Sequence, residues 1–108
     1  MSYVEIQYNI SDFSKNEPDF ERVVAAVGAY QQQVEKADFR IQQTAEIEQF
    51  EDNVQIKLVR HTLHTLEEDV ALGLAEQMRE GVGQFFLDQE RERLDSHFSG
   101  IALRHSER

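Results

Sequence analysis

The spacing of apolar residues changes along this chain, and that change constrains the fold more than any other feature. Over residues 4–10, apolar and polar residues alternate, which is typical of a β-strand with one buried face. Over residues 20–37, apolar residues instead recur at steps of three and four, as on one side of an α-helix. The sequence therefore predicts a strand over 3–10 and a helix over 18–36.

Residues 38–66 allow two interpretations, and the choice between them decides the fold class. The segment lacks glycine and proline and contains several Glu and Gln residues, which permits one long helix or a helical hairpin. Polar residues at every second position of 40–48, and apolar residues at every second position of 54–58, instead predict two strands. We favour the strands, because the strand over 3–10 needs hydrogen-bonding partners within the chain.

A two-residue turn at positions 52–53 would join these strands into a hairpin. It places Ile47 opposite Leu58 on the buried face. It also places Glu48 opposite Lys57 on the polar face, where unlike charges attract. A three-residue turn would set Ile47 against Lys57 and mix the two faces, so the pattern predicts a turn of even length.

The C-terminal part of the chain is predicted to be helical. Apolar residues over 66–82 have helical spacing, the glycines of 81–83 indicate a break or kink, and residues 87–98 carry a second apolar stripe. Gly100 can end that second helix. Residues 101–108 are therefore expected to form a flexible tail.

Together these elements predict one α+β domain over residues 1–100. Its small sheet would have three mainly antiparallel strands, in the chain order β-α-β-β-α, with the helices on one face. The alternative is a mainly α-helical chain, in which a long helical hairpin follows the N-terminal strand. Because an open sheet leaves unpaired edges, pairing with a second copy of the chain is expected.

Composition excludes several classes of function. The 108 residues include no cysteine, which rules out disulfides, zinc–thiolate sites and thiol nucleophiles. The net charge of −10 disfavours direct binding to nucleic acid or to an anionic membrane. No secretory signal is visible and no apolar run approaches the roughly 20 residues of a membrane-spanning helix, so we expect a cytoplasmic protein.

One metal-binding hypothesis arises from His61, His64 and Glu68. On a helix, these three side chains would share one face and suit zinc or iron. On a strand, His61 and His64 would point to opposite faces and the site would not form. The sequence indicates no other cofactor.

No P-loop, dinucleotide-binding or nucleophile-elbow motif occurs, and the carboxylates at 67–69 fit a helix start better than catalysis. We therefore expect a non-enzymatic protein–protein interaction or assembly module. Its partner would be itself, as a homodimer or higher oligomer, or another protein. Large apolar residues expected at the core or at the interface are Phe85, Phe86, Leu94 and Phe98.

An alternative function is that of an acidic nucleic-acid mimic, which inhibits a basic protein by occupying its binding cleft. This hypothesis requires many carboxylates to gather on one surface. The carboxylates concerned are Glu5, Glu35, Asp38, Glu46, Glu48, Glu51 and Asp52.

Overall fold

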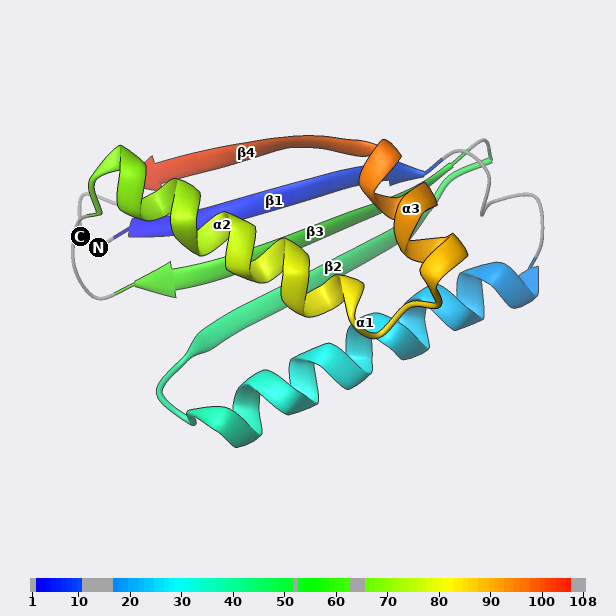
Figure 1. Cartoon of the computed structure of the whole chain (residues 1–108), viewed down its shortest axis with the longest axis horizontal. Helices are drawn as coiled ribbons and strands as arrows, with labels where there is room; N and C mark the ends of the chain where they lie inside the picture. The colour runs from blue at the N-terminus through cyan, green and yellow to red at the C-terminus, as the bar shows by residue number, and fades with distance from the viewer. Residues whose placement is uncertain (1, 11–16, 52, 63–65, 106–108) are drawn as a thin grey trace.

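The chain folds into one antiparallel sheet with helices on one face. The computed structural model describes residues 2–10, 17–51, 53–62 and 66–105. The described elements are β1 (Ser2–Ile10), α1 (Glu17–Ala37), β2 (Gln42–Gln49), β3 (Val54–Thr62), α2 (Glu68–Gly83), α3 (Asp88–Ser96) and β4 (Phe98–His105). Figure 1 shows α2 and α3 in front of the sheet and α1 running alongside β2. The predicted α+β class is confirmed, and the mainly α-helical alternative is wrong.

The order of the strands places β1 and β3 at the centre of the sheet. The full order is β2-β3-β1-β4, and every neighbouring pair is antiparallel. The two edges are therefore β2 and β4. With one helix after β1 and the other two after β3, this is the split βαβ arrangement of ferredoxin-like folds. None of the helices in the described part of the chain is long and apolar enough to cross a bilayer.

The predicted alternation of β1 is confirmed, and this strand lies at the centre of the core. Its apolar residues are fully buried beneath the helices, while the polar residues between them lie on the face without helices, the open face. β3 alternates in the same way from Val54 to Leu58, and α1 buries one side at helical spacing. The principal buried residues of these elements are Val4, Ile6, Tyr8, Ile10, Val23, Val27, Tyr30, Val34, Val54, Ile56 and Leu58.

The buried side of α2 overlaps in part with the predicted stripe of Leu66, Val70, Leu74, Met78 and Val82. The helix buries Ala71, Ala75, Met78 and Val82, whereas Val70 is 53% exposed. Small alanines allow the helix to approach β1, against which α2 packs. The predicted stripe therefore shares Met78 and Val82 with the side that faces the sheet, but it included the exposed Val70 and missed the two alanines.

The predicted break at the glycines of 81–83 is confirmed, since α2 ends at Gly83. Gly81 also has a packing role. A Cβ atom at this position would lie 2.6 Å from the ring of Tyr30, so only glycine allows this contact between α1 and α2.

β2 and β3 form the predicted hairpin, but their register is shifted by two residues. Ile47 lies opposite Ile56 and not opposite Leu58. The Phe50 N–H donates to the Asn53 carbonyl at 2.8 Å, so the two-residue loop begins one position earlier than predicted. Because the loop length is still even, each face of the hairpin carries the same side chains as in the predicted register.

A fourth strand corrects both the strand count and the predicted C-terminal tail. Residues Phe98–His105 pair with β1, so the tail predicted for 101–108 is wrong as far as residue 105. The register shifts between Gln7 and Tyr8, and this bulge interrupts the alternation that would indicate a strand. Gly100 does not end a helix but lies at the bulge with φ +157°, which L side chains rarely adopt. Residues 106–108 lie outside the described residues.

Candidate functional site

The structure does not provide the geometry that the metal-binding hypothesis requires. His61 lies in β3 and Glu68 begins α2, so the helical face that would unite them does not exist. The ring of His61 instead lies 5.5 Å from that of Tyr3, between centroids, on the open face. His64 lies outside the described residues. Within the described residues, no group of three His, Asp or Glu side chains could hold a metal ion.

The four residues expected at the core or at an interface all pack in or against the core. Leu94 is 1% exposed and Phe86 is 8% exposed, so neither is available to a partner. Phe85 packs against the core beside Tyr30, with 6.2 Å between ring centroids. Phe98 packs edge-on against Tyr8, at 5.4 Å. Packing within one chain accounts for these contacts, and an interaction through the partly buried Phe85 and Phe98 stays a prediction.

The acidic residues of the mimic hypothesis do not gather on one surface. Glu5, Glu46 and Glu48 lie at open-face positions of the sheet, whereas Glu35 and Asp38 lie on or after the last turn of α1, on the opposite side. Glu51 lies in the hairpin loop, and Asp52 lies outside the described residues. Asp38 is also paired with Arg40, whose side chain donates two hydrogen bonds of 3.0 Å. These hydrogen bonds lower the pKa of Asp38.

A polar cluster links α2, α3 and β4 around Arg79. Its guanidinium donates to Glu76 at 3.1 Å and lies 3.8 Å from Asp95. Its central carbon lies 3.9 Å from the ring centroid of Phe98, a cation–π contact. Below it, burial raises the pKa of Tyr8 to about 12, a rise that the charge of Arg79 partly opposes. Because Arg79 already has these partners, we assign the cluster a role in holding the helices on the sheet.

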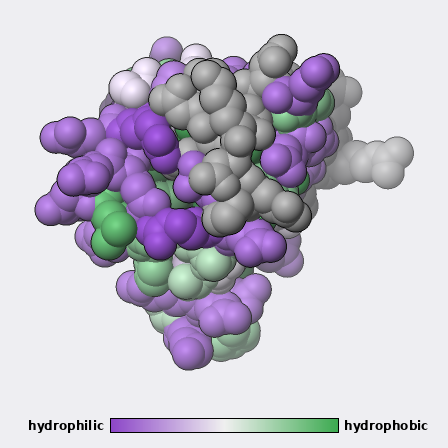
Figure 2. All heavy atoms as spheres, turned by 90° about the vertical axis from the view of Figure 1, so that its right-hand side faces the viewer, coloured by the Kyte–Doolittle hydropathy of each residue, from purple (hydrophilic) through white to green (hydrophobic). Residues whose placement is uncertain are grey.

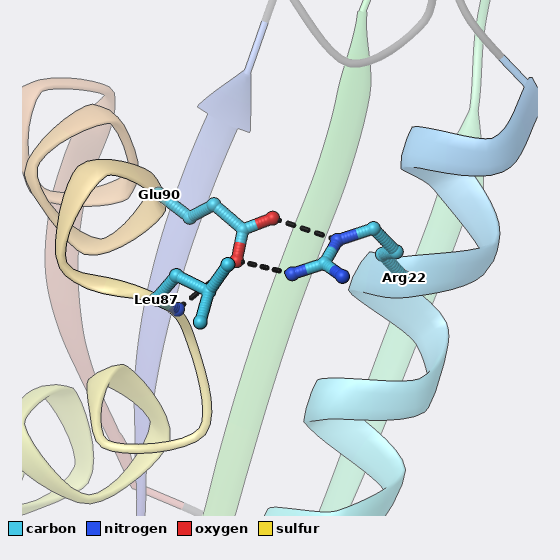
Figure 3. A network of polar contacts seen from close by, with 3 residues as sticks. All are labelled: Arg22, Leu87 and Glu90. Atoms are coloured by element: carbon cyan, nitrogen blue, oxygen red, sulfur yellow. Dashed lines mark hydrogen bonds and ion pairs between the residues drawn. The ribbon is translucent and has the colours of Figure 1, made fainter.

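A second cluster joins α1 to the start of α3 (Figure 3). The Arg22 side chain donates to both carboxylate oxygens of Glu90, at 2.8 and 2.6 Å. The same carboxylate accepts the Leu87 N–H at 3.0 Å, which satisfies a backbone donor at the helix start. These contacts hold α1 and α3 together, and both oxygens of the Glu90 carboxylate accept hydrogen bonds.

The remaining candidates are the free edges of the sheet, and the hairpin shows which backbone groups reach the edge of β2. Since Phe50 and Asn53 form a hydrogen-bonded pair, even-numbered residues of β2 bond to β3 and odd-numbered ones point outward. The Gln43 carbonyl agrees with this assignment, because it accepts a 2.9 Å hydrogen bond from the Gln31 side chain of α1. From Ala45 to Gln49, within the described residues, no neighbouring strand uses the outward groups.

The same alternation, carried across β3 and β1, assigns the backbone groups of β4. Odd-numbered residues of β1 bond to β4, as the 3.1 Å hydrogen bond from the Asn9 N–H to the His97 carbonyl shows. Ala102 therefore points its backbone groups inward, while Ile101 and Leu103 point theirs outward. The side chains of Ile101 and Leu103 are only partly buried against the core. Among the described residues, no other strand uses the outward backbone groups of β4, so this strand is an edge with partly exposed apolar side chains.

Comparisons with known proteins inform the fold but do not identify a functional site. No model of a protein family matches the chain, and no curated protein matches it. A solved structure titled "De novo designed protein Foldit4" is similar, with a TM-score of 0.52 and 16% sequence identity, over 99% of this chain and 98% of that chain. At that identity the likeness shows the fold alone.

Proposed function

We propose that this chain is a non-enzymatic assembly module, which forms a homodimer by pairing the β4 strands of two copies. The observation that supports this proposal is the edge of β4, where Ile101 and Leu103 combine partly exposed side chains with outward backbone groups. A second, antiparallel β4 would satisfy those groups and cover both side chains.

One pairing register suits this edge better than its neighbours. If Ala102 lies opposite Ala102 of the second copy, Ile101 lies opposite Leu103 on both sides of the twofold axis. Shifting the register by two residues would set Leu103 against Ser99, or Ile101 against His105. Only the first register gives each apolar residue an apolar partner. β4 also contains no acidic residue, so this register places no carboxylates opposite each other.

The hydrogen-bond geometry fits the same register. Ile101 and Leu103 both point their backbone groups outward, so they can exchange both hydrogen bonds on each side of the axis. Ala102 points inward and would form a non-hydrogen-bonded pair with its copy, with Cα atoms about 4.5 Å apart. That separation lies within the range of about 4.4–6.8 Å that a disulfide spans.

A single introduced cysteine tests the proposal, because the natural chain contains none. We expect Ala102→Cys to form a disulfide-linked dimer under mild oxidation, visible on a non-reducing gel and reversed by a reductant. Thr44→Cys is the matched control, since Thr44 also lies at an open-face position of an edge strand, but on β2. It should cross-link far more slowly.

Two results would overturn the homodimer. One is equal cross-linking of the two cysteine variants, which would reflect random collision. The other is a monomer by light scattering for the unmodified chain at tens of micromolar.

A further inference from the structure

We propose that the free edge of β2 binds an extended basic segment of a partner protein, which adds to the sheet as a further strand. This inference goes beyond the homodimer, because it uses the opposite edge and does not depend on pairing through β4. Strand addition of this kind obtains affinity from main-chain hydrogen bonds and specificity from alternate side chains.

The free part of this edge is the second half of β2. At the start of the strand, α1 covers the edge, where the Gln31 side chain occupies the outward carbonyl of Gln43. Figure 1 shows α1 and β2 diverging toward the end of β2. Ala45, Ile47 and Gln49 therefore offer their outward N–H and C=O groups to an incoming strand. The structure contains no β-bulge or proline in this stretch that would block pairing.

Side chains on the open face define what kind of strand fits. Glu46 and Glu48 are exposed neighbours on that face, opposite Lys57 and Gln55 of β3. No ion pair or hydrogen bond within the described ranges engages either carboxylate. Because their backbones bond to β3, both would form the closer, non-hydrogen-bonded type of pair with an added strand. Lys or Arg at alternate positions of that strand would therefore face them.

An apolar side chain at the end of the strand adds a second contact. Phe50, which follows β2 directly, is 48% exposed. The end of the molecule that carries the hairpin is otherwise mainly hydrophilic (Figure 2). We expect an apolar residue of the bound segment to pack on Phe50, beyond the two basic positions.

A second copy of this chain is a poor occupant of the same edge. Antiparallel self-pairing gives Ile47 an apolar partner in two registers, opposite Ala45 or opposite Ile47 itself. The first sets Glu46 against Glu46 of the other copy, and the second sets Glu46 against Glu48. Like charges directly opposite each other destabilise a sheet, so the carboxylates select a basic partner and reject self-association.

Synthetic peptides test this proposal by fluorescence anisotropy. The probe is a labelled Phe-Val-Lys-Val-Lys-Val peptide. In an antiparallel arrangement its lysines would face Glu48 and Glu46, its valines would bond to β2, and its phenylalanine would lie beside Phe50. One control peptide has Glu in place of Lys. The other keeps every side chain but carries N-methyl groups on the valine nitrogens, which removes the donors that a β2 partner must supply.

We expect the lysine peptide to bind and both control peptides to bind about tenfold more weakly or not at all. The double variant Glu46→Lys/Glu48→Lys should weaken binding of the lysine peptide by a similar factor. Glu80→Lys/Glu92→Lys is the matched control, because it makes the same change in net charge on exposed positions of α2 and α3. Its effect on binding should be small at physiological salt.

Three outcomes would overturn the proposal. Failure of the lysine peptide to bind at millimolar concentration would show that the edge is closed to basic strands. Equal binding of the N-methylated peptide would indicate general charge attraction without strand addition. Equal loss in the two double variants would show that net charge, and not the β2 edge, controls binding.

Discussion

The two edge strands of this sheet have the same position in the architecture but different chemistry. β2 carries two glutamates and no basic residue, and α1 covers its first half. β4 carries one arginine and no acidic residue, and it leaves Ile101 and Leu103 partly exposed. An unpaired edge is a hazard that proteins control with charge, cover or pairing. Here the comparison suggests charge and cover for β2, and pairing with a copy for β4.

The largest expected effect comes from placing a charge at the proposed twofold axis. In the β4 pair, Ala102→Lys would set two lysines directly opposite each other, because a symmetric interface repeats every substitution. We expect the dissociation constant of the dimer to rise by about two orders of magnitude, measured by analytical ultracentrifugation. The fold should tolerate this change, since residue 102 lies opposite Glu5 on the open face.

The matched change on the other edge is Thr44→Lys, which should leave the dimer intact. Mixing Ala102→Lys with Ala102→Glu should restore a dimer, because the two substitutions then attract across the axis. An Ala102→Lys variant that dimerises like the unmodified chain would remove β4 from the interface.

A smaller effect is expected from neutralising the β2 edge. Glu46→Gln/Glu48→Gln removes the repulsion of facing carboxylates, roughly 0.2–1 kcal/mol per pair. The second edge then becomes competent for self-pairing, and dimers should associate further into larger species as concentration rises. Light scattering across a concentration series would measure this growth. Glu80→Gln/Glu92→Gln, with the same net charge, should show none; growth in both variants would contradict a specific role of the edge.

The smallest effect concerns the ion pair that joins α1, beside β2, to α3, beside β1. The hydrogen bond from Arg22 lowers the pKa of Glu90. A carboxyl group whose pKa is lower in the folded chain stabilises the fold above its unfolded pKa, and this stability is lost as pH falls through the folded pKa. Glu90→Gln should therefore lower Tm slightly at neutral pH, and the two proteins should converge in acid.

Thermal melts followed by circular dichroism would measure this convergence. Glu92→Gln on the same helix is the control, and it should not change Tm at either pH. A Glu90→Gln difference that persists unchanged in acid would assign the effect to packing and not to the ion pair.

The parts of the fold that could be predicted from sequence are those with an uninterrupted period. The alternation of β1 and the helical spacing of α1 were sufficient by themselves, and the parity of the hairpin preserved its faces. The hairpin register could not be predicted from sequence, because the hydrogen bond that closes the loop joins backbone atoms of Phe50 and Asn53. Turn-forming residues at 52–53 favoured a loop one position later.

β4 and the candidate site could not be predicted from the sequence, for a different reason. The bulge at Gly100 separates Phe98 from Ile101 and hides a period of two, so a strand looked like the end of a helix and a tail. The adjacent residues Phe85 and Phe86 were expected at the core or at an interface, and both pack in or against the core. The two free edges can be identified only when the strand order is known, because no local sequence pattern indicates which strands lie at the edges of the sheet.

The position of β2 at the outer margin has a consequence for avidity. If two copies join through β4, their sheets become one of eight strands, with a β2 at each end. At about 4.8 Å per strand the two β2 edges lie roughly 34 Å apart and are related by the twofold axis. A partner carrying two basic segments on a tether long enough to bridge them would bind the second at high local concentration. Dimerisation would thereby convert weak single contacts into durable attachment.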